Sequence, residues 1–230
     1  MRKIGGFLAI FISYVSCTVN LDDNKRILTD VLVTDDAGQP AADVFVEALG
    51  YSGSNVDFRD NPFAVLGTAH TGTDGTATIS SFIKSEGTTQ FKFTSINGNN
   101  VDNFYFVNNK VFENSLRFDL GTVVIAAPAT VELTFNNVSM VQTDVPWQAT
   151  FPDFDCIQYI NSQGRLDTTR SSCYELVSIA SRVTAISTIR TFNLTTLLGA
   201  QVVVDYAVNG VNMSETFTVT DPNQTYEINY

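Results

Sequence analysis

The titratable residues of this chain set narrow limits on the chemistry that it could perform. It has one histidine, His70, on a predicted strand without a second histidine or a cysteine at ligand spacing, so neither a histidine-based triad nor a zinc site is expected. A glycosidase would need two carboxyl groups about 5 to 10 Å apart across a cleft. The adjacent acidic pairs Asp22-Asp23, Asp35-Asp36 and Asp153-Phe154-Asp155 all fall in a linker or a turn. We therefore predict a protein that is not an enzyme and has no catalytic residues.

Two acidic groups could offer oxygen ligands to Ca²⁺, which takes six to eight of them. Asp57 and Asp60 share one predicted loop, and Asp153 and Asp155 share another. Neither group has the spacing of a dedicated calcium loop, and ordinary solvated loops explain both. We predict no metal site and no cofactor, with these four carboxylates as weak Ca²⁺ candidates.

A cluster of aromatic residues is a weak candidate for binding a ligand. Trp147, Phe151, Phe154 and Tyr159 lie in or near the segment between two cysteines. If their rings are exposed, they could stack on a sugar or anchor a partner protein. The alternative is that they pack in a core, where the single Trp of a β-sandwich is more often found.

The three cysteines divide into one at the end of an apolar leader and a pair further along the chain. Cys156 and Cys173 are close enough in sequence to close a short loop, and in an exported protein such a pair predicts a disulfide. Two buried free thiols are the alternative.

The first residues have the pattern of an export signal. Arg2 and Lys3 precede an apolar run of about 12 residues, whereas a membrane-spanning helix needs roughly 20. The small residue Ser16 before Cys17 makes this leader similar to that of bacterial lipoproteins. The resemblance implies that residues 1–16 are removed and that Cys17 carries the lipid.

Two further residues bear on the location of the protein. Asp22 and Asp23, shortly after Cys17, resemble the signal that sends Bacteroidetes lipoproteins to the outer face of the outer membrane. The alternatives are an ordinary solvated linker after the leader, and an ordinary secretory leader that yields a periplasmic or secreted protein.

The charge of the chain excludes one class of partner. Its 24 acidic and 13 basic residues give a formal net charge of −11, or −13 without Arg2 and Lys3 (−11 − 2). An acidic chain without a basic cluster is a poor ligand for nucleic acid, whose binding depends on Lys and Arg. Attachment to a membrane would depend on the lipid rather than on charge. Residues 17–26 are polar and predict a flexible tether.

Short alternating segments separated by turn residues predict strands, and no segment shows a sustained helical period. The first half combines the turn 35–40, the hairpin signal Asp74-Gly75 and the strand pattern 119–124. This combination resembles the carboxypeptidase-regulatory-like, transthyretin-like β-sandwich. The resemblance implies a structural or binding module over residues 27–127.

A new alternation starts at Pro128, after Ala126-Ala127, and continues to the last residue. It includes the two-residue hairpin signal Asn209-Gly210 and a last segment, 225–230, that could pair at a sheet edge. We therefore predict an all-β protein of two β-sandwiches in tandem. Its parts would be a signal peptide over 1–16, a tether over 17–26, a transthyretin-like sandwich over 27–127, and a second sandwich of unassigned family over 128–230.

These observations favour an exported, lipid-anchored, non-enzymatic protein of the bacterial surface that acts as a binding or adhesion module. Its partners would be the membrane, through the lipid on Cys17, and a glycan or protein ligand. One alternative is a fimbrial subunit, because the fimbrial proteins of Bacteroidetes are similar two-domain lipoproteins. A protease cut at Lys25-Arg26 would then precede assembly by strand exchange. The other is a glycan-binding accessory protein of a polysaccharide-uptake system.

Overall fold

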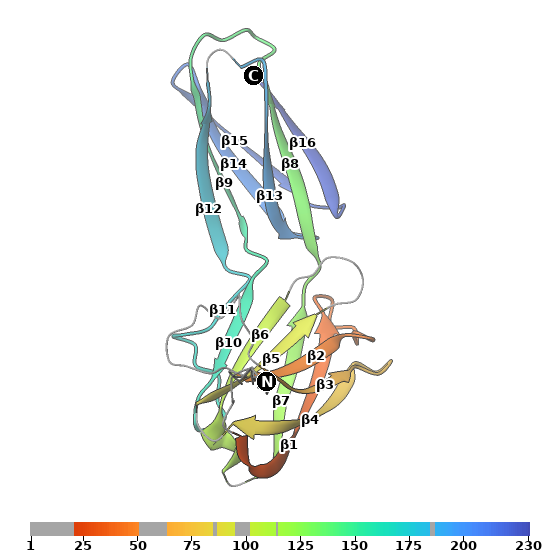
Figure 1. The fold of residues 1–230 in the computed structure, drawn as a ribbon. Coiled ribbons are helices and arrows are strands. Elements are labelled where there is room, and N and C mark those ends of the chain that lie inside the picture. Colours follow the sequence, from red (N-terminus) through yellow and green to blue (C-terminus); the bar gives the residue numbers. More distant parts are fainter. Residues whose placement is uncertain (1–20, 51–63, 85–86, 95–101, 114, 185–186) are drawn as a thin grey trace, which may run out of the picture.

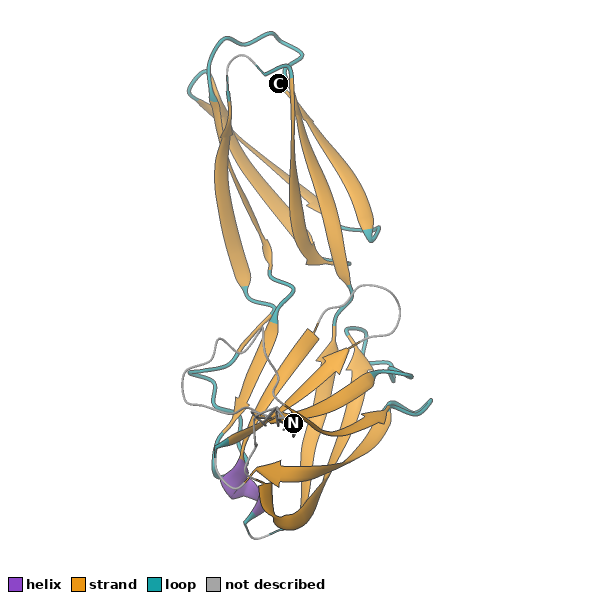
Figure 2. Cartoon of the chain, viewed as in Figure 1, coloured by secondary structure: helices purple, strands orange, loops and turns teal. Residues whose placement is uncertain are grey.

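The computed structural model describes residues 21–50, 64–84, 87–94, 102–113, 115–184 and 187–230. Strands make up most of these residues, and a short 3-10 helix, η1 (Asn109–Phe112), lies in the first half (Figure 2). The strands form two β-sandwiches placed end to end, so the predicted all-β fold is confirmed (Figure 1). Among the described helices, none has the length and apolarity needed to cross a membrane.

The first sandwich packs a three-stranded sheet, β4-β1-β7, on a six-stranded sheet, β11-β10-β6-β5-β2-β3. Apolar side chains alternate along these strands and meet between the two sheets, with Phe91 and Phe93 fully buried at the centre. The strands are β1 (Leu21–Asp35), β2 (Phe45–Gly50), β3 (Ala64–His70), β4 (Thr76–Lys84), β5 (Thr88–Thr94), β6 (Asp102–Asn108), β7 (Arg117–Ile125), β10 (Cys156–Ile160) and β11 (Ser172–Cys173).

The second sandwich packs a four-stranded sheet, β12-β9-β14-β15, on a three-stranded sheet, β13-β8-β16. Its core is centred on Phe135, whose ring lies 5.4 Å from that of Trp147. The last segment of the chain pairs at the edge of the smaller sheet, as predicted. The strands are β8 (Pro128–Asn136), β9 (Val145–Pro152), β12 (Leu176–Val183), β13 (Ile189–Leu197), β14 (Gln201–Val208), β15 (Val211–Thr218) and β16 (Asn223–Asn229).

The predicted limits of the second domain are wrong in one respect. β10 and β11 belong by sequence to the second half, yet β10 pairs in parallel with β6 and extends the sheet of the first sandwich (Figure 1). Cys156 and Ile160 are buried there. The physical reason is that β5 pairs with only one edge of β6, and β10 supplies the backbone partners for the other edge. The second sandwich is therefore interrupted by a segment that returns to the first.

The predicted tether is also shorter than expected at its end nearest the first sandwich. Residues 21–26 are part of β1, where Leu21 pairs with Lys84 and Arg26 with Phe82, across a register shift. The Arg26 guanidinium lies 4.3 Å from the centre of the Phe82 ring. Backbone pairing and this cation–π contact order a polar segment that has no apolar face of its own. Residues 17–20 lie outside the described residues.

Gly75 fixes the turn that leads into β4, and its replacement is the first prediction. It has a φ of +75°, and a Cβ there would lie 2.4 Å from the carbonyl oxygen of Val33. Gly210 has a similar φ of +80°, but a Cβ there would meet nothing within 4 Å. A non-glycine residue in this conformation costs about 1–2 kcal/mol. We expect Gly210→Ala to lower the free energy of unfolding by about that amount, and Gly75→Ala by more. Urea denaturation measures both, and equal losses would contradict the predicted clash.

Candidate functional site

The aromatic residues predicted to form one binding cluster are dispersed by the fold. Trp147 and Phe151 lie on β9 in the core of the second sandwich, 3% and 5% exposed. Phe154 is half-buried in the connection between the sandwiches, and Tyr159 lies on β10 in the first. A shared ligand platform over these four rings is therefore wrong. The rings of β9 point inward because the alternation of that strand places Trp147, Ala149 and Phe151 on its buried face.

Tyr159 is the ring of this set that lies on a strand of the first sandwich, and two neighbouring side chains contact it. Phe106, its partner on β6, stacks on it at 4.9 Å with 16° between the planes. Arg170, which precedes β11 on the other side of β10, holds its guanidinium 4.1 Å from the ring centre. A sugar would have to displace one of these neighbours to stack on Tyr159. The stack instead fixes the segment between the two cysteines against β6.

The weak Ca²⁺ candidates that the structure describes have local roles. Asp153 accepts hydrogen bonds from the backbone N–H of Phe154 at 2.8 Å and of Asp155 at 3.4 Å, so it caps a turn. Asp57 and Asp60 lie outside the described residues. Within the described ranges, no group of three or more His, Cys, Asp or Glu side chains could hold a metal ion. The single histidine, His70, packs its ring 4.9 Å from that of Phe45.

The predicted disulfide between Cys156 and Cys173 is present, with an S–S distance of 2.02 Å. It joins residues that face each other on β10 and β11. Cys17, the predicted lipidation site, lies outside the described residues.

The disulfide lies in a two-stranded ribbon that runs from the second sandwich into the first. β9 pairs with β12 in the second sandwich, and β10 pairs with β11 in the first. The backbone bonds Asp153 N–H to Glu175 O at 2.7 Å and Tyr174 N–H to Asp155 O at 3.0 Å continue the pairing between them. The sandwiches are therefore joined by this ribbon as well as by the direct step from β7 to β8.

Tyr174 fastens the ribbon to the end of the first sandwich. Its hydroxyl accepts from the backbone N–H of Ala126 at 3.0 Å and from the side-chain amide of Asn103 at 3.1 Å, and it lies 3.0 Å from the carbonyl oxygen of Val124. Burial raises the pKa of this phenol, so it remains a neutral donor to Val124. Its backbone has a φ of 55°, unusual for a tyrosine. Sequence reasoning missed Tyr174, and its place directly after Cys173 was the available signal.

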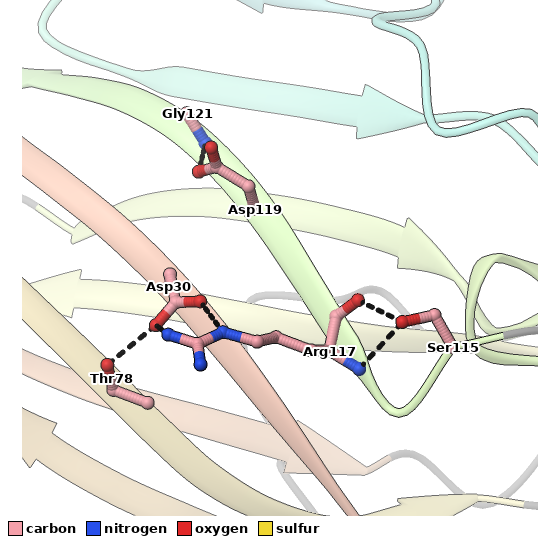
Figure 3. A network of polar contacts seen from close by, with 6 residues as sticks. All are labelled: Asp30, Thr78, Ser115, Arg117, Asp119 and Gly121. Atoms are coloured by element: carbon pink, nitrogen blue, oxygen red, sulfur yellow. Dashed lines mark hydrogen bonds and ion pairs between the residues drawn. The ribbon is translucent and has the colours of Figure 1, made fainter.

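A polar network crosses the three-stranded sheet of the first sandwich (Figure 3). Arg117 on β7 donates through both Nε and an Nη to the carboxylate of Asp30 on β1, and Thr78 on β4 donates its hydroxyl to the same carboxylate at 2.6 Å. The hydrogen bond from Arg117 is the main cause that lowers the pKa of Asp30. Asp119, further along β7, is engaged by the backbone N–H of Gly121. The network contains no unpaired nucleophile or acid, and it links β1 to both of its neighbours.

The candidate binding site is a hollow of about 640 Å³ on the outer face of the sheet β12-β9-β14-β15. A row of paired residues crosses its floor, from Ala180 on β12 to Gln148, Asp205 and Ser214 on β9, β14 and β15. Next to this row, Ala207 pairs with Asn212. These small and polar side chains are mostly exposed. The depression exists because alanines stand where longer side chains would fill the face.

The chemistry of the hollow suits a neutral polar ligand. The carboxylate of Asp205 accepts hydrogen bonds, the amides of Gln148 and Asn212 donate and accept, and the hydroxyl of Ser214 does both. Such a set complements neighbouring hydroxyl groups, which also donate and accept. Asp205 is the only carboxylate among the described residues that line this hollow. Glycoside hydrolysis by the usual route would need a second one facing it. Sequence reasoning missed these residues because they come together only through the strand register.

The structure is that of an all-β protein of two sandwiches with an open polar hollow on the outer face of the second. No protein-family model matches the sequence, and no curated protein matches it. Among solved structures, it is similar to a Streptococcal ancillary pilin, with 9% identity over 90% of this chain and 63% of that one, and a TM-score of 0.30. The chain thus spans less than two thirds of the length of that pilin.

Two further structures are similar over most of both chains. One is the shaft pilin spaA from Lactobacillus rhamnosus GG, with 9% identity, 89% and 97% coverage and a TM-score of 0.25. The other is a provisionally named cell adhesion protein from Bacteroides ovatus, with 7% identity, 87% and 91% coverage and a TM-score of 0.30. At these values the likeness concerns general β architecture and assigns no ligand, assembly or activity to this chain.

Proposed function

We propose that this protein is an exported, lipid-anchored, non-enzymatic binding module of the bacterial cell surface, and that its second sandwich binds a neutral glycan. The observation that carries the proposal is the hollow around Asp205 and Gln148, which is large enough for a small ligand and open along the sheet. An open hollow suits part of a long chain better than an enclosed small molecule. The leader and Cys17 support the export and the anchor.

The direction of the strands supports display of the hollow away from the anchor. β1 runs parallel to β7, and β7 leads through Ala127 into the second sandwich. The start of β1 is therefore at the end of the first sandwich remote from the second. A lipid on Cys17, a few residues before β1, would place the first sandwich between the membrane and the binding face.

Binding of neutral polysaccharides to the purified protein tests the glycan proposal. The probes are immobilised starch, mannan, xylan and arabinogalactan, and retention is compared for the wild type, Asp205→Asn and Ala207→Trp. We expect at least one probe to be retained, and both variants to lose at least tenfold in affinity, since one removes the acceptor and the other fills the depression. Glu132→Gln, which makes the same charge change on the exposed side of β8, is the matched control.

Retention that is unchanged in both hollow variants would place the ligand elsewhere and overturn the assignment. Loss in Glu132→Gln as well would indicate a general charge effect. Trp147→Ala is not a useful probe, because Trp147 is 3% exposed in the core and its removal would lower the free energy of unfolding by about 3–5 kcal/mol, whatever its effect on retention.

The anchor is tested separately on the native protein and a Cys17→Ala variant. We expect a lipid mass increment and membrane fractionation that both disappear in the variant, and cleavage of the native protein by protease added to intact cells. A soluble product without the increment would show that the leader is an ordinary secretory signal.

A fimbrial subunit remains the second candidate because of the position of β1. This strand lies between β4 and β7 and contributes Ile27, Val31 and Val33 to the core, so its loss would open a groove that a strand of a neighbouring subunit could fill. A cut at Lys25-Arg26 would not remove it, because Ile27 and the following residues would stay on the chain. Strand exchange would require a cut after Asp35. Ladders on SDS gels after such cleavage would support this candidate, and a monomer that keeps β1 would exclude it.

A further inference from the structure

In the first sandwich, the first strand, β1, is paired in parallel with β7, which leads into the second sandwich. In the second sandwich, the first strand, β8, is paired in parallel with the last strand of the chain, β16. β1 pairs with β7 from Leu28 beside Arg117 to Asp35 beside Ile125. β8 pairs with β16 from Thr130 beside Asn223 to Asn136 beside Asn229. Parallel neighbours of this kind place the beginning of one strand and the end of the other at opposite ends of the pair.

This arrangement determines how the protein responds to tension along its length. A pull at the start of β1 and at the end of β7 acts along the two strands in opposite directions, so their hydrogen bonds are loaded together. The same holds for the start of β8 and the end of β16, near Tyr230, at the far end of the second sandwich (Figure 1). Strands that are pulled apart sideways lose their bonds one after another, which needs less force.

Additional contacts extend both parallel ladders at their ends. The N–H of Leu28 donates to the carbonyl oxygen of Leu116 at 2.8 Å, just before β7, and the Asp30–Arg117 pair bridges the same two strands. In the second sandwich, the N–H of Thr130 donates to the carbonyl oxygen of Pro222 at 2.8 Å, just before β16. Both pairs therefore have additional backbone contacts at the start of their parallel ladders.

The junction between the sandwiches is reinforced in the same direction. One connection is the single chain segment that leads directly from β7 to β8. The other is the two-stranded ribbon in which the segment β9–β10 pairs with the segment β11–β12. The Cys156–Cys173 disulfide closes the part of that ribbon that pairs with β6, and the Tyr174 hydroxyl holds it to Ala126. A pull on the second sandwich is thus shared between two connections.

We propose that the chain is a tension-bearing stalk, in which the β1–β7 and β8–β16 pairs resist stretching in shear and the disulfide-closed ribbon holds the two sandwiches together. The proposal rests on the proposed function in one respect, because tension arises if the protein is anchored at Cys17 and held at its second sandwich. The mechanical property itself belongs to the strand order and does not depend on which ligand is bound.

Single-molecule force spectroscopy on the full mature chain tests the proposal by comparing two pulling directions. In the first, handles are attached at residue 17, in place of the lipid, and at Tyr230, which shears both parallel pairs. In the second, they are attached at Val138 and Tyr230, at the same end of β8 and β16, which peels these strands apart. Val138 is 64% exposed, so a handle there leaves the core intact.

At one pulling speed, we expect the second sandwich to unfold at a force at least twofold higher in the first direction than in the second. Forced unfolding reports the unfolding barrier, so the two directions can differ at a single equilibrium stability. Equal forces in the two directions would overturn the proposal. This result would leave glycan retention and lipidation unaffected, so the two proposals can fail separately.

The disulfide gives a second readout in the same experiment. With the bridge intact, the segment between Cys156 and Cys173 cannot extend, whereas the Cys156→Ser/Cys173→Ser variant should release about 57 Å more chain on full unfolding, from 17 residues at about 3.6 Å each less the 3.9 Å between the Cα atoms. We also expect the variant to separate its two sandwiches at a lower force. If the variant separates and unfolds its two sandwiches at the same forces as the wild type, the bridge does not reinforce the junction.

Discussion

Phe135→Ala is expected to lower the free energy of unfolding of the second sandwich by about 3–5 kcal/mol, the usual cost of removing a buried phenylalanine ring. Phe135 is fully buried on β8 and lies at the centre of a cluster of rings. Its ring centre is 5.4 Å from that of Trp147, 6.1 Å from that of Phe192 and 6.2 Å from that of Tyr206. The cavity would touch strands of both sheets, so neither sheet alone could close it.

Guanidinium denaturation followed by tryptophan fluorescence measures this loss directly, because Trp147 is the only Trp of the chain and sits against the ring that is removed. Phe192→Ala is the matched control. Phe192 is half-buried on the edge strand β13, so its removal should cost clearly less. Similar losses for the two variants would indicate that the core relaxes around Phe135 and that the cluster is not a fixed unit.

The sequence predicted most strands correctly because their signal is local. Alternation of apolar and polar residues has a period of two, and a segment such as 202–208 shows it without reference to any neighbour. The Asn209-Gly210 turn also depends on its own residues, since Asn209 and Gly210 have φ values of 51° and 80° in the structure. Features that depend on a few neighbouring residues could therefore be predicted from the sequence.

The pairing partners of these strands could not be predicted, because pairing depends on residues that are distant in the sequence. Nothing within residues 156–160 assigns this segment to one sandwich or the other, and its pairing with β6 depends on the free edge that the first sandwich leaves. The tether was misjudged for a related reason. Arg26 has no apolar face, yet backbone pairing with β4 and the ring of Phe82 order it.

The candidate site illustrates the same limit. Sequence reasoning looked for rings, because large aromatic side chains are the most recognisable ligand contacts, and the fold placed Trp147 in the core. The hollow depends on small residues, Ala180 and Ala207, that stand on different strands. An alanine carries no signal until the register shows that its neighbours are Gln148 and Asn212. A depression formed by missing side chains can be recognised only after the sheet is assembled.

The second large effect is expected from the double variant Cys156→Ser/Cys173→Ser, which should lower the free energy of unfolding by about 3 kcal/mol. The bridge spans a sequence separation of 17 residues, and closing a loop of that size restricts the unfolded chain. The loss has a structural part as well, because Cys156 is 1% exposed and a serine hydroxyl there would be buried. Cys156→Ala/Cys173→Ala separates the two parts, since alanine breaks the loop without burying a hydroxyl.

The location of this loss distinguishes a local staple from a reinforced junction. If the disulfide stabilises only the β10–β11 excursion, hydrogen exchange in the variant should increase at residues 156–173 and nowhere else. If it holds the two sandwiches together, exchange should also increase at Ala126, whose N–H is bonded to the Tyr174 hydroxyl, and at Asp153, whose N–H is bonded to Glu175. We expect the second pattern, because Tyr174 follows Cys173 directly and loses its fixed position when the bridge is removed. Protection that persists at Ala126 would show that the junction is held by Tyr174 and the ribbon without help from the disulfide.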